Sequence, residues 1–245
     1  MQTFKRTYAH AMQGLGSGLY SSGVLRREEA PPSGDWQRWL HSLFAIHDID
    51  AMIRLDLPRW TLRATRLVNT FLQQRPRAQV FEYGSGAGTV FLAKRAEIVV
   101  SVEHDRRWHG VVTRMVAQHP NVLATLVEPG PAEADCSHWS AHPGWRGRDF
   151  LDYVHAIDRF EGQFDLIVID GRCRAHCLKA ALRRVKPDGL ILFDNAGRRR
   201  YRAALECCAL PKLTTGGLTA CLPYPDPSML IAPKLQTLQS LAGTP

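Results

Sequence analysis

Residues 79–93, which read QVFEYGSGAGTVFLA, decide the fold of this chain. A short apolar segment runs directly into three glycines at alternate positions, and a helix-forming segment follows them at once. Glycine lets the backbone turn sharply and approach a ligand closely, because no Cβ blocks the approach. The first turn of the following helix offers N–H groups that have no partner within the helix. A strand, a glycine loop and a helix in this order are typical of doubly wound α/β domains that hold a nucleoside-containing ligand.

The spacing of the glycines bears on which ligand is held. The dinucleotide fingerprint places its third glycine five residues after the first, and here that position is Thr89. An acid, Glu82, precedes the loop, where it would repel a diphosphate but attract a sulfonium or ammonium group. The pattern E-x-G-x-G-x-G, from Glu82 to Gly88, resembles the first motif of class I S-adenosylmethionine (SAM) methyltransferases. A structural turn that binds nothing is the alternative interpretation.

A second acid supports the SAM interpretation. The segment 97–103 is predicted to be the second strand and ends in Glu103, about 20 positions after Gly84. At this spacing an acid reaches the ribose hydroxyls, and a carboxylate accepts hydrogen bonds from both of them. The alternative is a solvated glutamate at a strand end. We expect SAM to contact residues of both motifs: Glu82, Gly84, Ser85, Gly86, Gly88, Glu103 and His104.

Strongly apolar segments alternate with helical ones from residue 79 onward. This alternation indicates a parallel sheet that is buried on both faces. The predicted strands are 79–83, 97–103, 122–127, 165–170 and 190–194, and the predicted helices are 35–47, 58–75, 88–95, 105–118, 150–159, 173–185 and 197–209. The final runs 217–222 and 228–232 are predicted to form an antiparallel hairpin at the sheet edge. We therefore expect an α/β, Rossmann-like, doubly wound and mostly parallel sheet, with an N-terminal helical extension and cap in residues 1–57 and a methyltransferase domain in residues 58–245.

The composition and charge of the chain bear on its cellular compartment and on its binding partners. The chain has 245 residues, of which 45% are hydrophobic and 22% charged, as in ordinary globular proteins. No run approaches the roughly 18 apolar residues of a membrane-spanning helix. The six cysteines form no C-x-x-C pair, which favours reduced thiols in the cytoplasm over a disulfide framework or zinc site. The net charge of +8 and the run Arg198-Arg199-Arg200 leave nucleic acid open as a partner, beside a small-molecule substrate or a general preference for arginine. The oligomeric state is not predicted.

Acids gather where the predicted strands end. Asp170 closes the fourth strand, and Asp194 with Asn195 closes the fifth. Two carboxylates and an amide oxygen suit Mg²⁺ or Ca²⁺, although acids at strand ends also cap helices. The arrangement resembles the metal-dependent catechol- and caffeoyl-type O-methyltransferases, in which such residues hold an ion that orients and activates the acceptor oxygen. That resemblance implies a possible metal site at these three residues.

The match to those enzymes is partial. They place a lysine, the general base, three positions after the fourth-strand aspartate, and here that position is Cys173. Beside Asp170, the candidates for catalytic roles are His176 as a base and Arg172 as a partner for an acidic substrate or an oxyanion. Arg174 is a similar candidate. Solvated side chains at the start of a helix are the alternative for all three.

Four motifs in order extend the resemblance over residues 78–208. They read E-Y-G-S-G from Glu82, V-E-H-D from Val102, D-G-R from Asp170 and D-N from Asp194. Together they resemble a group of largely uncharacterised bacterial class I SAM methyltransferases, which implies a SAM site but no particular acceptor. The leading hypothesis is O-methylation of a small polar metabolite or sugar, with metal assistance as an option. Methylation of RNA or another nucleic acid, and SAM binding without catalysis, are the alternatives.

Overall fold

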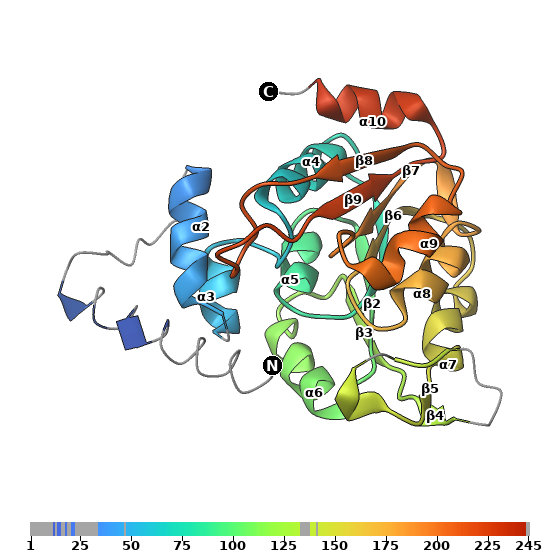
Figure 1. The fold of residues 1–245 in the computed structure, drawn as a ribbon, viewed down its shortest axis with the longest axis horizontal. Helices are drawn as coiled ribbons and strands as arrows, with labels where there is room; N and C mark the ends of the chain where they lie inside the picture. Colours follow the sequence, from blue (N-terminus) through green and yellow to red (C-terminus); the bar gives the residue numbers. More distant parts are fainter. Residues whose placement is uncertain are drawn as a thin grey trace.

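The computed structural model describes residues 34–46, 48–132, 138–140 and 142–243, together with residues 12, 14, 15, 18, 21 and 22. This part of the chain forms a seven-stranded sheet with helices on both faces (Figure 1). The predicted fold class is confirmed: the fold is α/β and Rossmann-like, with a mostly parallel sheet and antiparallel strands at one edge. About half of the predicted N-terminal extension, residues 1–57, lies outside the described residues.

The sheet has the strand order β3-β2-β1-β6-β7-β9-β8. Its parallel strands are β1 (Gln79–Tyr83), β2 (Ile98–Glu103), β3 (Val122–Leu126), β6 (Phe164–Ile169) and β7 (Val185–Phe193). Strand β9 (Ser228–Ile231) pairs antiparallel with β7 and with β8 (Lys212–Thr215). The winding reverses between β1 and β6, and ligands of open α/β sheets bind at such a switch point, beyond the carboxyl ends of the strands.

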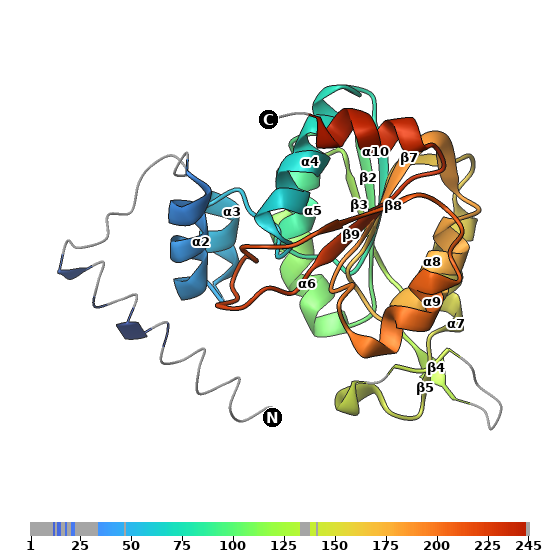
Figure 2. The ribbon, with the colours of Figure 1, turned by 45° about the horizontal axis from the view of Figure 1, so that its top comes forward.

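Helices cover both faces of the sheet (Figure 2). One face carries α4 (Leu62–Gln73), α5 (Ala87–Ala93), α6 (Arg106–Met115) and α10 (Leu235–Ala242), and the other carries α7 (Leu151–Val154), α8 (Arg174–Ala181) and α9 (Arg202–Glu206). In β1, Phe81 and Tyr83 pack on the α8 side, whereas Val80 packs on the α4 side. Successive side chains of a strand alternate between the faces, so Glu82 points to the α4 and α5 side.

Shorter elements complete the described part of the chain. A small two-stranded sheet joins β4 (Gly130–Pro131) to β5 (Arg148–Asp149), and 3-10 helices occupy η1 (Pro143–Trp145), η2 (His155–Arg159) and η3 (Arg199–Tyr201). None of the helices within the described ranges is both long and apolar enough to cross a membrane.

Two N-terminal helices, α2 (Asp35–Phe44) and α3 (Ile49–Arg54), lie beside α5 in both views of the ribbon (Figures 1 and 2). They share a buried cluster with Ala87 at the start of α5 and with the loop between β8 and β9. Trp39 Nε1 donates to Leu222 O at 2.9 Å, and Ser42 Oγ accepts from Cys221 N at 2.9 Å. These two helices, called the cap from here on, are therefore attached to a loop that lies far from them in the sequence.

Two predictions about the last strands are wrong. Residues 186–189 have the composition of a turn but belong to β7. The pairing of β7 with β6 shifts register between Phe164 and Leu166, and residues 186–189 form the bulge at this shift. The hairpin partner of β9 is Lys212–Thr215 rather than 217–222. The segment 217–222 instead contacts the cap and the start of α4, because Leu218 O accepts from Leu62 N.

Candidate functional site

The loop after β1 and the loop after β6 touch each other at two glycines. Gly84 has a φ of 91°, a conformation that other residues rarely adopt. A Cβ on Gly84 would lie 2.6 Å from Gly171 Cα, and a Cβ on Gly171 would lie 1.9 Å from Tyr153 Oη. Both positions therefore require glycine, and their contact fixes the carboxyl ends of β1 and β6 against each other.

The other two glycines of the loop differ in their surroundings. A Cβ on Gly86 would meet no atom within 4 Å, so the backbone there is open to an approaching ligand. A Cβ on Gly88 would lie 3.0 Å from Glu82 Oε1, which makes glycine the residue that lets α5 start close to this carboxyl group. Gly86 is thus the position at which the loop offers its backbone outward.

Glu82 lies beneath the loop and is buried among hydroxyl groups. Its Oε2 atom accepts hydrogen bonds from Thr89 Oγ1 and Ser101 Oγ, each at 2.6 Å. Thr89 Oγ1 also accepts from Gly86 N at 2.9 Å, which links the carboxyl group to the backbone of the loop. Burial raises the pKa of Glu82 to about 8, although both hydroxyl hydrogen bonds oppose the rise. The carboxyl group is therefore largely protonated at neutral pH in the free protein.

Glu103 ties the end of β2 to the same loop. Its Oε1 atom accepts from His104 N at 2.7 Å and from Asp105 N at 2.8 Å, and its Oε2 atom accepts from Ser85 N at 3.2 Å. A carboxylate oxygen has room for two hydrogen bonds, so Oε2 keeps capacity for one more donor. The geometry places this free capacity beside the glycine loop, where a ribose hydroxyl is expected.

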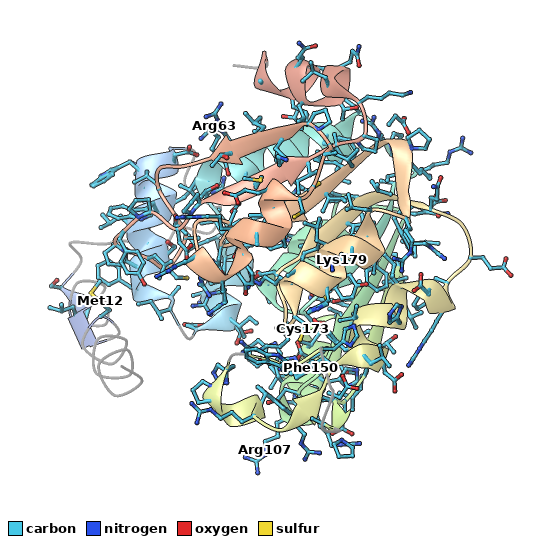
Figure 3. The ribbon with its side chains drawn as sticks, turned by 45° about the vertical axis from the view of Figure 1, so that its right-hand side comes forward. Met12, Arg63, Arg107, Phe150, Cys173 and Lys179 are labelled. Carbon is cyan, nitrogen blue, oxygen red and sulfur yellow. The ribbon has the colours of Figure 1, made fainter. Side chains whose placement is uncertain are left out.

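Aromatic rings surround His104 on the α7 side of the loop. The centroid of its imidazole lies 4.7 Å from that of Trp145, 5.6 Å from Phe150 and 5.8 Å from Tyr153. Phe150 and the neighbouring Cys173, both labelled in Figure 3, belong to the same packed cluster. Phe150 and Tyr153 are fully buried, so these rings pack His104 against the core at the end of β2, and of the three only Trp145 is partly exposed.

Trp108 supports the loop from the other side. It lies in the first turn of α6, and its Nε1 atom donates to Ser85 O at 2.8 Å. Asp105 begins that helix, because its side chain accepts from Trp108 N at 3.0 Å. The indole is partly exposed, so it leaves an apolar surface beside the glycine loop.

Asp170 and Asp194 meet because β6 and β7 are neighbours in register, with Ile169 opposite Phe193. The guanidinium of Arg174 lies between them: Nη2 donates to Asp170 Oδ1 at 2.7 Å, and Nη1 donates to Asp194 Oδ2 at 3.2 Å. Burial alone would lower the pKa of Arg174, but the two carboxylates raise it above its ordinary value. This buried arginine supplies one positive charge to two acids, and burial together with the charge of Asp170 raises the pKa of Asp194 to about 7.

The predicted divalent metal site at Asp170, Asp194 and Asn195 does not fit this arrangement. Arg174 fills the space between the carboxylates, and Asn195 turns away, with its Nδ2 donating to Asp226 Oδ2 at 3.0 Å. Asn195 also has a φ of 54°, in the left-handed region that residues other than glycine rarely adopt. Within the residues that the structure describes, no three His, Cys, Asp or Glu side chains gather as a metal site. The compensating cation is an arginine.

The other two predicted catalytic residues are placed differently. Arg172 is half-buried, and its side chain makes no hydrogen bond or ion pair with any described residue; burial and the nearby Arg174 lower the pKa of its guanidinium. His176 lies on α8, with its ring 4.7 Å from that of His138, and burial lowers the pKa of its imidazole. No hydrogen bond joins His176 to Asp170 in the described part of the chain, so the two do not form an acid–base pair there.

Sequence reasoning missed several residues that build the site. Thr89 and Ser101 hold Glu82, Ser228 Oγ donates to Asp194 Oδ1 at 2.8 Å, and Trp108 supports the loop. The position of Arg174, four residues after Asp170 at the start of a helix, was a usable signal for an ion pair. The contacts of Ser101 and Ser228 had none, because β2 and β9 supply these side chains from more distant parts of the chain.

No family model matches this chain, and no curated protein matches it. Among solved structures it is similar to a methyltransferase-like protein from Silicibacter pomeroyi, at 23% identity and a TM-score of 0.48, over 76% of this chain and 96% of that one. It is also similar to an rRNA methylase from Streptococcus thermophilus, at 11% identity and a TM-score of 0.49, over 69% of this chain and 95% of that one. A putative methyltransferase from Streptococcus mutans in complex with SAH is similar at 14% identity and a TM-score of 0.45, over 67% of this chain and 95% of that one. Likeness at this level carries no argument about function, which rests on the geometry of the site.

Proposed function

We propose that this protein is a SAM-dependent methyltransferase that acts on a small polar molecule. The observation that carries the proposal is the pair of buried acids, Glu82 and Glu103, hydrogen-bonded to the glycine loop at the carboxyl ends of adjacent strands. One acid lies beneath the loop and the other beside it, which suits a ligand with a cationic end and a ribose. A dinucleotide would place its diphosphate against these acids.

Each part of SAM has a place in this arrangement. The free capacity of Glu103 Oε2 accepts from a ribose hydroxyl, and the open backbone at Gly86 lets the ligand lie close to the loop. The partly exposed ring of Trp145, which lies against His104, is the aromatic surface for the adenine ring. Glu82 loses its proton when the cationic methionine end binds, because a positive charge favours the carboxylate form.

The acceptor lies next to the loop at Asp170. Bound SAM would supply a methyl group on a positively charged sulfur, which would keep the electrons of the broken C–S bond as a neutral thioether. Asp170 would take the hydroxyl proton of the acceptor through Oδ2, the oxygen that Arg174 does not use, while a lone pair of the acceptor oxygen formed the new O–C bond. Orientation of the acceptor toward the methyl group supplies the remaining rate enhancement.

SAM binding by defined variants tests the proposal. We expect titration calorimetry to show SAM binding to the wild type, and Glu103→Gln to weaken it at least about tenfold, since a lost hydrogen bond to a charged group costs roughly 1.5–3 kcal/mol. Glu128→Gln is the matched control: Glu128 is a more exposed acid near the end of β3, paired with Arg106, and its loss should leave affinity unchanged. Equal effects of both substitutions, or preferential binding of NAD⁺, would overturn the proposed ligand.

The acceptor is sought by incubating the protein with labelled SAM and a metabolite extract. A labelled small molecule supports the proposal, whereas binding without transfer to any acceptor favours a non-catalytic SAM-binding protein. Label in added RNA, with affinity that falls steeply as salt rises, favours the nucleic-acid alternative. The arginine run gives that alternative little support, because Arg198 pairs with Asp226 at 2.9 Å and Arg200 packs over the ring of Tyr201.

A further inference from the structure

Arg174 has no hydrogen-bonding capacity left for a substrate. A guanidinium has five N–H donors, and all five have acceptors within the protein. Nε donates to Gly171 O at 3.0 Å, Nη1 to Asp194 O at 2.5 Å and to its Oδ2, and Nη2 to Asp170 O and Oδ1, both at 2.7 Å. The side chain is also buried, at 7% exposure. Arg174 is therefore a positioning residue rather than one that touches the reacting molecule.

The acceptors of Arg174 are the oxygens that a metal ion would need. A divalent ion at the ends of β6 and β7 would bind Asp170 Oδ1 and Asp194 Oδ2, the two atoms that the guanidinium engages. The second oxygen of Asp194 accepts from Ser228 Oγ at 2.8 Å. Of the four carboxylate oxygens, only Asp170 Oδ2 has no hydrogen bond from a described residue. The same guanidinium also binds three backbone carbonyls, so it holds the carboxyl ends of both strands.

We propose that Arg174 is a built-in replacement for a divalent metal: its guanidinium holds Asp170 and Asp194 in fixed positions, so that this edge of the sheet binds no metal ion and one oxygen of Asp170 stays free. The use of that oxygen in catalysis rests on the proposed methyl transfer. The proposal that Arg174 takes the place of a metal ion does not rest on methyl transfer, because it follows from the contacts of Arg174 alone.

The wild-type protein gives the first test. We expect its melting temperature and its affinity for SAM to be the same in Mg²⁺, in Ca²⁺ and in EDTA. A fall in either quantity on chelation, restored by one of these ions, would overturn the proposal. A protein that binds no SAM under any condition would instead count against the proposed function. Its melting temperature in each solution would still show whether a metal ion stabilises it.

The second test removes the guanidinium. Arg174→Gln keeps much of the side-chain length without the charge, which leaves two carboxylates facing each other. We expect this variant to melt at a lower temperature and to bind Ca²⁺ with a dissociation constant on the order of 1 mM, typical of weak oxygen sites, and added Ca²⁺ to restore its melting temperature. The double variant Arg174→Gln, Asp194→Asn should lose the Ca²⁺ response, because one of the two carboxylates is gone.

Arg198→Gln is the matched control. Arg198 pairs with a single carboxylate, Asp226, near the same edge of the sheet, so its removal exposes no pair of acids. If Arg174→Gln responds to Ca²⁺ no more than this control, the guanidinium does not occupy a cation site and the proposal is wrong. If Arg174→Gln folds neither with Ca²⁺ nor without it, the wild-type measurement decides the question.

Discussion

At the scale of single residues, Glu82 is a buried carboxyl group that holds a proton. Its hydroxyl partners and its place under the loop hold a carboxyl group whose pKa is raised to about 8, against an ordinary value of 4.5. The folded protein therefore favours the protonated form more than the unfolded chain does. The stability that this group contributes is complete below pH 4.5 and is lost as the pH rises through 8.

Replacing Glu82 by Gln should remove this pH dependence. We expect wild-type stability to fall between pH 5.5 and 8.5 by up to about 1.4 kcal/mol per pH unit more than that of Glu82→Gln, the limit for one proton. Urea denaturation at several pH values measures the difference. The affinity of the wild type for SAM should rise toward pH 8, as deprotonation becomes easier, whereas the variant should bind weakly at every pH. Glu97→Gln replaces an exposed acid before β2 and is the control, so it should behave as the wild type. If the stability of Glu82→Gln depended on pH as that of the wild type does, the expectation would be contradicted.

Gly171 permits the closest approach in the site. An added Cβ would overlap Tyr153 Oη, so we expect Gly171→Ala to destabilise the protein by roughly 1–3 kcal/mol, as overpacking does. Adding Tyr153→Phe removes the overlapping oxygen and should restore part of that loss. Chemical denaturation measures both variants.

Gly110→Ala is the control, because a Cβ at this position of α6 meets no atom within 4 Å. It should stabilise the helix by up to about 1 kcal/mol. Equal stability of Gly171→Ala and the wild type would mean that the loops after β1 and β6 are free to move apart.

Single residues of the site were predictable to different degrees. The gathering of Glu82, Gly84 and Glu103 at one loop was predictable, because β1 and β2 follow each other in the chain and pair with each other. The position of Arg174 between Asp170 and Asp194 did not follow, because it depends on the register of β6 with β7. The sequence indicated which acids gather at this edge but not which cation compensates them.

At the scale of elements, strand prediction depended on how deeply each strand is buried. Strand β1 has the predicted bounds, because its apolar run is buried on both faces. Strand β8 was missed, since its residues Lys212–Thr215 form a polar strand at the sheet edge. The start of β7 was missed because a bulge carries Pro187 and Gly189 within a strand, where their composition indicates a turn. Helix α3 lacked a long apolar repeat and was also not predicted.

The attachment of α2 can be weakened by one substitution. Trp39→Phe removes the hydrogen bond to Leu222 O, worth about 1 kcal/mol, so amide hydrogen exchange in residues 217–222 should become roughly fivefold faster, with no change in β6. Trp36→Phe is the control: Trp36 lies beside Trp39 but is 60% exposed. Faster exchange throughout the sheet would show that the cap is part of the global folding unit.

At the scale of the whole molecule, the fold class followed from the alternation of strands and helices. Apolar strands that are buried on both faces give a signal in the sequence itself, and the two clusters on either side of the sheet account for it. The pairing of the edge strands did not follow, because β8 is a polar strand with a weak signal. The position of α2 did not follow either, because it depends on a contact between residues 183 positions apart. The sequence predicts SAM as the ligand of the glycine loop, which stays a prediction, and it names no acceptor.

The contact between the cap and the loop after β8 has a consequence for synthesis on the ribosome. Trp39 and Ser42 bond to Leu222 and Cys221, so α2 emerges long before the loop that holds it exists. Until translation passes that loop, the apolar face of α2 has only its partners in α3 and at the start of α5, and the rest of it is open to chaperones or to misassociation. The contact spans most of the described chain and carries a high cost of loop closure, so it should form late in folding. A nascent chain stalled before residue 217 would contain the complete glycine loop but a cap without its contacts to this later loop.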